Sequence, residues 1–146
     1  STGNYDLVKK LLAKGVPIHG FGIQGHLLEE SPPDFDSVYE NVKRFVALGL
    51  DVEFTEVDIR IKGEPTRLQL EHQAELYGEL MRIALAFPGV TNVTTWGVSD
   101  AHSWITTFFP GYGSALLFDI HFNPKPAYYA FQLTLLQGPS RVKYVD

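Results

Sequence analysis

The sequence contains no cysteine, so it has no disulfide framework and no thiolate for catalysis or metal binding. It has no run of lysine or arginine, and its 12 basic residues against 17 acidic ones give a mild formal net charge of −5. A basic surface for nucleic acid or for an acidic membrane is therefore not expected. No apolar stretch reaches the roughly 18 residues that a membrane-spanning helix needs. The first residues, 1–4, do not read as a signal peptide.

The residues that are present fit an ordinary globular chain. Of the 146 residues, 45% are apolar and 20% are charged, which is enough for one domain with a real core. Aromatic content is high at 13%, and Trp96 and Trp104 lie close together in the sequence. Aromatic rings fill cores and also stack on sugars, and composition by itself favours the core.

Amphipathic segments alternate with short apolar segments along the chain. Helical spacing of apolar residues predicts helices over residues 5–14, 34–48, 66–87 and 125–137. The apolar segments between them predict strands over residues 16–26, 51–59 and 90–98. A long loop that contains Trp104 is expected after the third strand. Gly15 and Gly49 are placed to end the first two helices, and Pro126 suits the first turn of the last one.

This alternation predicts an α/β fold with a parallel sheet and helices packed outside it. A doubly wound sheet and a (β/α)₈ barrel both fit. No glycine-rich phosphate loop follows any strand, which weakens nucleotide binding, and the strands end in polar or aromatic residues, where a barrel places its chemistry. A whole barrel needs eight strands and about 250 residues. We therefore expect residues 1–137 to be a segment of a barrel and residues 138–146 to be a tail or linker.

Strand alternation collects polar side chains at the carboxyl ends of the three strands. A carboxylate that faces a barrel interior is costly unless it is paired or functional, so Glu56 is the main catalytic candidate. The sets of residues expected to share a face are Ile18, Gly20, Gly22, Gln24 and His26 on the first strand, Val52, Phe54, Glu56 and Asp58 on the second, and Asn92, Thr94 and Trp96 on the third.

Four segments resemble signature stretches of glycoside hydrolase family 10, the retaining β-1,4-xylanases. They are residues 22–27 (GIQGHL), 54–60 (FTEVDIR), 96–104 (WGVSD followed by SW) and 116–128 (LLFD followed by PKPAY). The resemblance extends over about residues 5–137, from the fifth helix of the family to the eighth. It implies a (β/α)₈ barrel of which this chain supplies about strands 6–8. It also implies a secreted enzyme that cleaves internal β-1,4 bonds of xylan with retention at the anomeric carbon.

The resemblance also implies roles for individual residues. Glu56 would be the nucleophile, His26 would hydrogen-bond to Glu56, and Asp58 would orient His26. Of the substrate-binding residues, Gln24 would lie at the floor of the sugar-binding cleft. His26 would also border the sugar.

Both tryptophans, Trp96 and Trp104, would line the subsite of the sugar whose bond breaks. Two departures from the family pattern, Ile23 in place of the usual Phe and Gly25 in place of a common Ser, remove no reacting group.

One reacting group of the family has no counterpart in this sequence. The acid/base Glu of the family follows a segment resembling Trp-Asp-Val-Val-Asn, which is absent here. Glu56 and Asp58 cannot replace the pair, because two residues apart on one strand they are roughly 6.6 Å apart on the same wall. We therefore expect the isolated chain to be inactive and to need the N-terminal segment of the same barrel as its partner, with xylan or xylo-oligosaccharide as substrate.

Other interpretations remain open. The tryptophans could serve a non-catalytic carbohydrate-binding or scaffold module, and a half-barrel could assemble with copies of itself through its strand edges beside Ile18 and Val93. Arg60 and Asp100 are expected to hold loops through ion pairs. The histidines lack metal-ligand spacing, so neither a metal nor another cofactor is expected.

Overall fold

The computed structural model describes residues 2–138. The expected tail at residues 138–146 therefore lies, apart from its first residue, outside the described part of the chain. No helix among the described residues is long and apolar enough to cross a membrane. The helices are α1 (Thr2–Ala13), α2 (Phe35–Val46), α3 (Arg67–Ala86), the short α4 (Ile105–Phe108), α5 (Pro126–Gln137) and the 3₁₀ helix η1 (Asp100–His102); the strands are β1 (Gly20–Ile23), β2 (His26–Leu28), β3 (Asp51–Lys62), β4 (Val90–Thr95) and β5 (Tyr112–Gly113).

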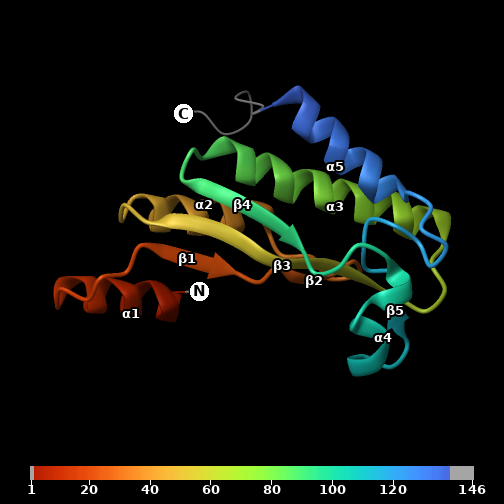
Figure 1. Cartoon of the computed structure of the whole chain (residues 1–146), viewed down its shortest axis with the longest axis horizontal. Coiled ribbons are helices and arrows are strands. Elements are labelled where there is room, and N and C mark those ends of the chain that lie inside the picture. The colour runs from red at the N-terminus through yellow and green to blue at the C-terminus, as the bar shows by residue number, and fades with distance from the viewer. Residues whose placement is uncertain (1, 139–146) are drawn as a thin grey trace.

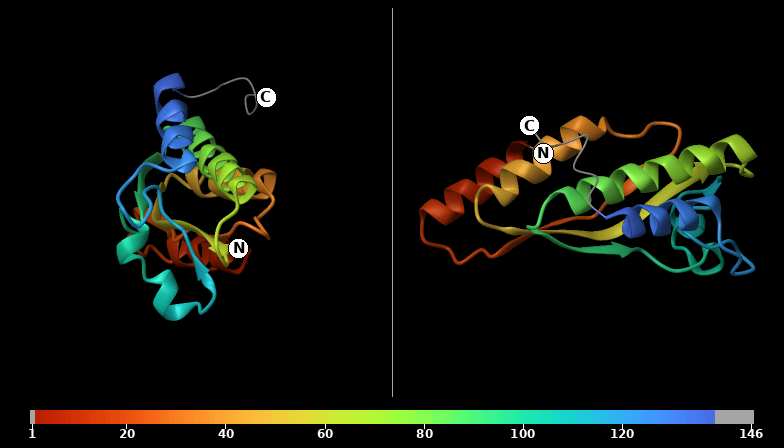
Figure 2. Two further views of the ribbon diagram at one scale, coloured as in Figure 1. Left: turned by 90° about the vertical axis from the view of Figure 1, so that its right-hand side faces the viewer. Right: turned by 90° about the horizontal axis from the view of Figure 1, so that it is seen from above.

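The strand β3 is the centre of the sheet. It pairs in parallel with β1, β2 and β4 and antiparallel with β5. Figure 1 shows β3 running between β1 and β4, with α3 and α5 side by side. Seen from above in Figure 2, α2 and α3 lie along the strands. The expected parallel α/β arrangement is confirmed.

The helices begin and end where local sequence chemistry dictates. Asp34 caps α2 because its carboxylate accepts hydrogen bonds from two backbone N–H groups of the first turn, at 3.3 and 3.2 Å. Thr66 and Gln69 form a capping box at the start of α3. Gly49 follows α2 with φ of +78°, a conformation that suits glycine, and Pro126 opens α5. The four expected helices are confirmed within a few residues.

One apolar core joins β3 to the helices. Residues from β3, α2 and α3 pack together with little or no exposure to solvent, and they fix the sheet face that the helices cover. The most buried members are Val42, Phe45, Val52, Phe54, Val57, Ile59, Tyr77, Ile83 and, from α5, Ala127.

A bulge in β3 corrects the expected alternation of that strand. Phe54 pairs with Val93 and Val57 with Thr95, so three residues of β3 span two of β4. Val52 and Phe54 on one side of this bulge and Val57 and Ile59 on the other all belong to the same core. The strand therefore exchanges faces near Glu56. The prediction that Val52 and Phe54 share a face with Glu56 and Asp58 was wrong.

The first expected strand is also interrupted. It divides into β1 and β2 at Gly25, which has φ of +84° and lies close to Val57. Ile18 precedes β1 and packs against the core, so it does not share a face with Gly20 and Gly22, which are exposed.

The alternation expected for the third strand is confirmed. Asn92, Thr94 and Trp96 are exposed, whereas Val93 and Thr95 are half-buried. The long loop that follows contains η1, α4 and β5, which were not expected. These elements matter because β5 pairs with the last residues of β3 and extends that strand to Lys62.

Candidate active site

Three ionisable side chains meet where β2 and β3 pair. His26 lies opposite Asp58 in the parallel register of these strands. The Nδ1 atom of His26 is 3.0 Å from Oδ2 of Asp58, and its Nε2 atom is 3.1 Å from Oε2 of Glu56. The imidazole thus bridges two carboxylates that project from the same face of β3. The hydrogen bond expected between His26 and Glu56 is present, and Asp58, expected to orient His26, contacts the other ring nitrogen.

The two carboxylates differ in their access to solvent. Asp58 is completely buried, whereas the side chain of Glu56 is 25% exposed. Burial raises the pKa of Asp58 above its ordinary value, while the hydrogen bond from Trp104 and the nearby charges of His26 and Arg60 lower it. Asp58 is therefore an internal support of the site, and Glu56 is the carboxylate that a ligand can reach.

Trp104 closes the site from the loop after β4. Its Nε1–H donates a hydrogen bond of 2.8 Å to Oδ2 of Asp58. The indole also lies beside the imidazole of His26, with 4.9 Å between ring centroids and 53° between ring planes. The rings of Phe108 and Phe109 pack against the indole, with 5.3 and 5.4 Å between ring centroids. The same oxygen of Asp58 thus holds both rings in place.

Trp96 and Gln24 lie near this group but are less constrained. Trp96 is 45% exposed, and its backbone N–H donates to the carbonyl of Val57 at 2.8 Å. Gln24 is exposed, and its carbonyl accepts a 2.9 Å hydrogen bond from the backbone N–H of Glu56. Their backbones are thus tied to the segment that carries Glu56. Their expected contacts with sugar stay predictions.

Sequence reasoning misjudged Arg60. An ion pair was expected, but the guanidinium carbon lies over the ring of Phe109, 4.1 Å from its centroid, and 5.6 Å from the centroid of Tyr112. The sequence patterns predict neither of these aromatic contacts. The only signal was that Arg60, two residues after Asp58, has the same strand parity as Glu56 and Asp58.

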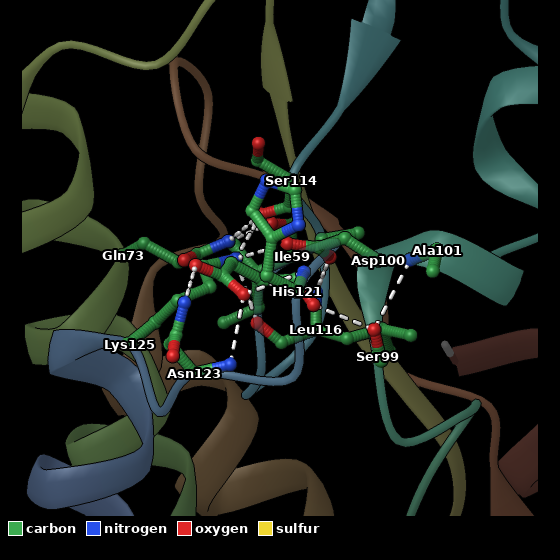
Figure 3. Close-up of polar contacts among 12 residues, drawn as sticks. Ile59, Gln73, Ser99, Asp100, Ala101, Ser114, Leu116, His121, Asn123 and Lys125 are labelled. Carbon is green, nitrogen blue, oxygen red and sulfur yellow. Dashed lines mark hydrogen bonds and ion pairs between the residues drawn. The ribbon is translucent and has the colours of Figure 1, made fainter.

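Asp100 has the structural role expected of it. It forms a buried ion pair with Lys125, 3.0 Å from Nζ to Oδ2, and its other oxygen accepts from the backbone N–H of Leu116 at 2.8 Å. The Nζ atom of Lys125 also donates to the carbonyls of Ser114 and Leu116, both at 2.7 Å (Figure 3). Gln73 reaches the carbonyls of Ser114 and Ile59 from α3. These side chains fix the segment around residues 114–116 beside β3.

No group of three or more His, Cys, Asp or Glu side chains within residues 2–138 is arranged to hold a metal ion.

A parallel β/α sheet with a carboxylate–imidazole–carboxylate group and an indole at its strand ends is the arrangement expected of a segment of a (β/α) barrel. The family model described as "Glycosyl hydrolase family 10" matches residues 1–133, and the chain belongs to this family.

Individual relatives agree with this assignment. The endo-1,4-beta-xylanase B of Thermotoga neapolitana is 40% identical over 129 residues, which cover 88% of this chain and 37% of that protein. The crystal structure of xylanase 10B from Thermotoga petrophila in complex with xylobiose superimposes with a TM-score of 0.87 and 41% identity, covering 91% of this chain and 41% of that one. The structure of an endo-1,4-beta-xylanase of Penicillium canescens superimposes with a TM-score of 0.89 and 32% identity. The match covers 97% of this chain and 43% of that one. The chain thus spans about 40% of the length of these relatives, and the expected segment of a (β/α)₈ barrel is confirmed.

Proposed function

We propose that this chain provides the nucleophile side of a retaining endo-1,4-β-xylanase active site. Glu56 attacks the anomeric carbon of a xylose unit and displaces the remainder of the xylan as the leaving group. The resulting covalent glycosyl-enzyme is later hydrolysed by water. The observation that carries the proposal is the contact between the partly exposed Glu56 and His26, whose other nitrogen lies against the buried Asp58. The names of the relatives supply the substrate class, since they are xylanases and one of them holds xylobiose.

His26 aims the nucleophile. Ionised carboxylates only accept hydrogen bonds, so both contacts of His26 are hydrogen bonds when its imidazole carries both protons. Its Nε2 atom then donates to Oε2 of Glu56 and holds the carboxylate that attacks carbon. Asp58 and Trp104 fix the ring plane, so the carboxylate of Glu56 is held in one direction.

The acid/base group comes, in this proposal, from the N-terminal segment of the same barrel. A retaining glycosidase needs two carboxyl groups about 5–5.5 Å apart on opposite sides of the scissile bond. Asp58 does not fit this role, because it projects from the same strand as Glu56, is completely buried and is already bound by His26 and Trp104. The chain alone is therefore expected to hydrolyse xylan poorly or not at all, since acid–base assistance is typically worth about 10²–10⁴-fold.

The tryptophans provide the sugar-binding surface of the proposed site. Trp104 is fixed beside His26, and Trp96 is 45% exposed at the end of the neighbouring strand. Aromatic faces of this kind stack on the apolar faces of sugar rings. Gln24 adds an exposed amide at the end of β1. Secretion, the location implied by the substrate, belongs to this proposal as well.

Reconstitution tests the proposal. The chain is mixed with the N-terminal, five-stranded segment of a family 10 xylanase, and xylan hydrolysis is measured together with the anomeric configuration of the first product. We expect hydrolysis with retention only in the mixture. Glu56→Gln should reduce the rate on the order of 10⁴-fold or more. Glu64→Gln is the matched control, because Glu64 is exposed in the loop after β3.

Two results would contradict the assignment. Undiminished hydrolysis by the reconstituted Glu56→Gln barrel would remove Glu56 as the nucleophile. Tight binding of xylohexaose by the isolated chain, with no hydrolysis in any reconstituted mixture, would instead favour the non-catalytic binding module. Calorimetry and the fluorescence of the two tryptophans measure that binding directly.

A further inference from the structure

Arg60 lies on β3 two residues beyond Asp58, on the side of the strand that carries the candidate site. Its guanidinium is 4.1 Å from the centroid of Phe109 and 5.6 Å from that of Tyr112. Its Nε atom is buried and has no hydrogen-bond partner within residues 2–138. The guanidinium thus lies against two aromatic faces, and its charge also acts on Asp58.

The first of these rings leads back to the site. Phe109 meets the indole of Trp104 edge to face, with 5.4 Å between centroids and 83° between planes. Trp104 in turn donates its indole hydrogen bond to Asp58 at 2.8 Å. The contacts from Arg60 through Phe109 and Trp104 to Asp58 therefore form a closed loop that begins and ends on the same strand.

Tyr112, the second ring beside Arg60, anchors this series of contacts from the other side. Tyr112 belongs to β5, which pairs with Lys62 at the end of β3. Its hydroxyl donates to Oε1 of Glu30 at 2.9 Å. Its backbone N–H donates to the carbonyl of Phe109 at 3.0 Å. Arg60 thus lies against two rings whose backbones are joined, and both belong to the segment that follows Trp104.

We propose that Arg60 is a positioning residue of the candidate active site, which holds Phe109 and thereby keeps the indole of Trp104 against Asp58. Arg60 contacts neither Glu56 nor a substrate in this role. Its effect on hydrolysis rests on the proposed function of Glu56, whereas its effect on Trp104 does not.

The charge of Arg60 acts in the same direction as its packing. Burial raises the pKa of Asp58, and the positive charge of Arg60 lowers it, together with His26 from β2 and Trp104 from the loop. The ionised form of Asp58 is the form that accepts from both rings. A residue that holds Trp104 in place and favours this ionisation supports the orientation of His26 in two ways.

The indole N–H of Trp104 reports on this role in the 146-residue chain itself. Its NMR signal is assigned by comparison with Trp96→Phe, and its exchange with water is measured in Arg60→Met and Arg60→Lys. We expect exchange to be roughly 2- to 30-fold faster in Arg60→Met, the range that corresponds to one cation–π contact. Arg60→Lys keeps the charge but not the planar stacking surface, so an intermediate value is expected.

Arg44→Met is the matched control. Arg44 lies over Tyr5, 4.7 Å from its centroid, on the far helix α2, so its removal also deletes a cation–π contact. It should leave the Trp104 signal unchanged. If Arg60→Met does not alter that signal more than Arg44→Met does, the proposal is overturned. Should Arg60→Met fail to fold, as judged by circular dichroism, the same criterion is applied to Arg60→Lys.

A double-mutant cycle tests the route through Phe109. Phe109→Leu should accelerate exchange of the same indole, and adding Arg60→Met should bring little further change, because both substitutions break one chain of contacts. Independent, fully additive effects would contradict that route. In the reconstituted barrel, Arg60→Met should slow hydrolysis as well. An inactive mixture, or one insensitive to Glu56→Gln, would count against the proposed function while leaving the indole result to decide the role of Arg60.

Discussion

Two groups of charged side chains in this chain use similar chemistry in opposite ways. Asp100 and Lys125 form an ion pair in which both side chains are only 6% exposed. In the other group His26 joins the buried Asp58 to Glu56, whose side chain is 25% exposed. Asp100 and Lys125 form their hydrogen bonds with other protein groups. In the second group, the carboxylate of Glu56 remains accessible to a ligand. A group of charged residues that is wholly buried thus has a structural role. A group in which one charged residue stays exposed is a candidate functional site.

The sealed pair should give the largest loss of stability when it is broken. Lys125→Met leaves Asp100 buried without its cation and frees two carbonyls, so we expect the free energy of unfolding to fall by about 3–5 kcal/mol. Urea denaturation followed by circular dichroism measures this loss. Lys43→Met is the control, because the Lys43–Glu40 pair is exposed and worth about 0.5 kcal/mol or less. Equal losses in the two variants would show that the buried pair is not special.

The cost of Lys125→Met should depend on pH. Burial raises the pKa of Asp100, against the opposing effects of Lys125 and the Leu116 N–H, and the half-buried Asp119 raises it slightly further. The folded state therefore binds a proton more readily than the unfolded state, whose value is near 3.8. The contribution of Asp100 to the free energy of unfolding is therefore greatest below the unfolded-state pKa. It declines as the pH rises through the raised folded-state pKa.

Without Lys125, the folded-state pKa of Asp100 should rise further. The stability difference between the wild type and Lys125→Met should then be smallest at acidic pH, where Asp100 is protonated in both, and should grow toward neutrality. Urea titrations at several pH values measure it. The Lys125→Met, Asp100→Asn double variant should lose most of this dependence; a double variant that keeps it would assign the dependence to another group.

In the group formed by His26, Asp58 and Glu56, Asp58 should contribute more to the stability of the fold than Glu56. Asp58→Asn leaves a buried amide facing the N–H of Trp104 and the ring of His26, so we expect a loss of about 1–3 kcal/mol. The fluorescence of Trp104 should change in the same variant, because its hydrogen-bond acceptor is altered. Asp36→Asn, in an exposed position of the first turn of α2, is the control. An Asp58 variant as stable as this control would mean that the carboxylate does not organise the rings.

Most of this arrangement could be predicted from sequence, and the errors have physical causes. Helical periodicity and capping residues located the four longer helices, and the segment around Glu56 located the carboxylate–imidazole contacts through its family resemblance. Periodicity failed at the bulge between Phe54 and Val57, because a bulge depends on pairing with β4 and has no local signal in β3. The ring partners of Arg60 were missed because Phe109 and Tyr112 are about 50 residues away in the sequence, in a segment expected to be loop.

Glu56→Gln should have the smallest effect on stability although it has the largest expected effect on hydrolysis. The side chain is partly exposed and meets only the imidazole of His26 at its Oε2 atom among the described contacts, so replacing the carboxylate by an amide removes an interaction worth about 1 kcal/mol or less. Urea denaturation beside Asp58→Asn measures the contrast between two acids two residues apart on one strand. A residue kept for chemistry can be neutralised at little cost to the fold, whereas a residue kept to hold its neighbours cannot. A loss for Glu56→Gln as large as that for Asp58→Asn would place Glu56 among the supports of the site and remove the distinction on which its assignment as nucleophile depends.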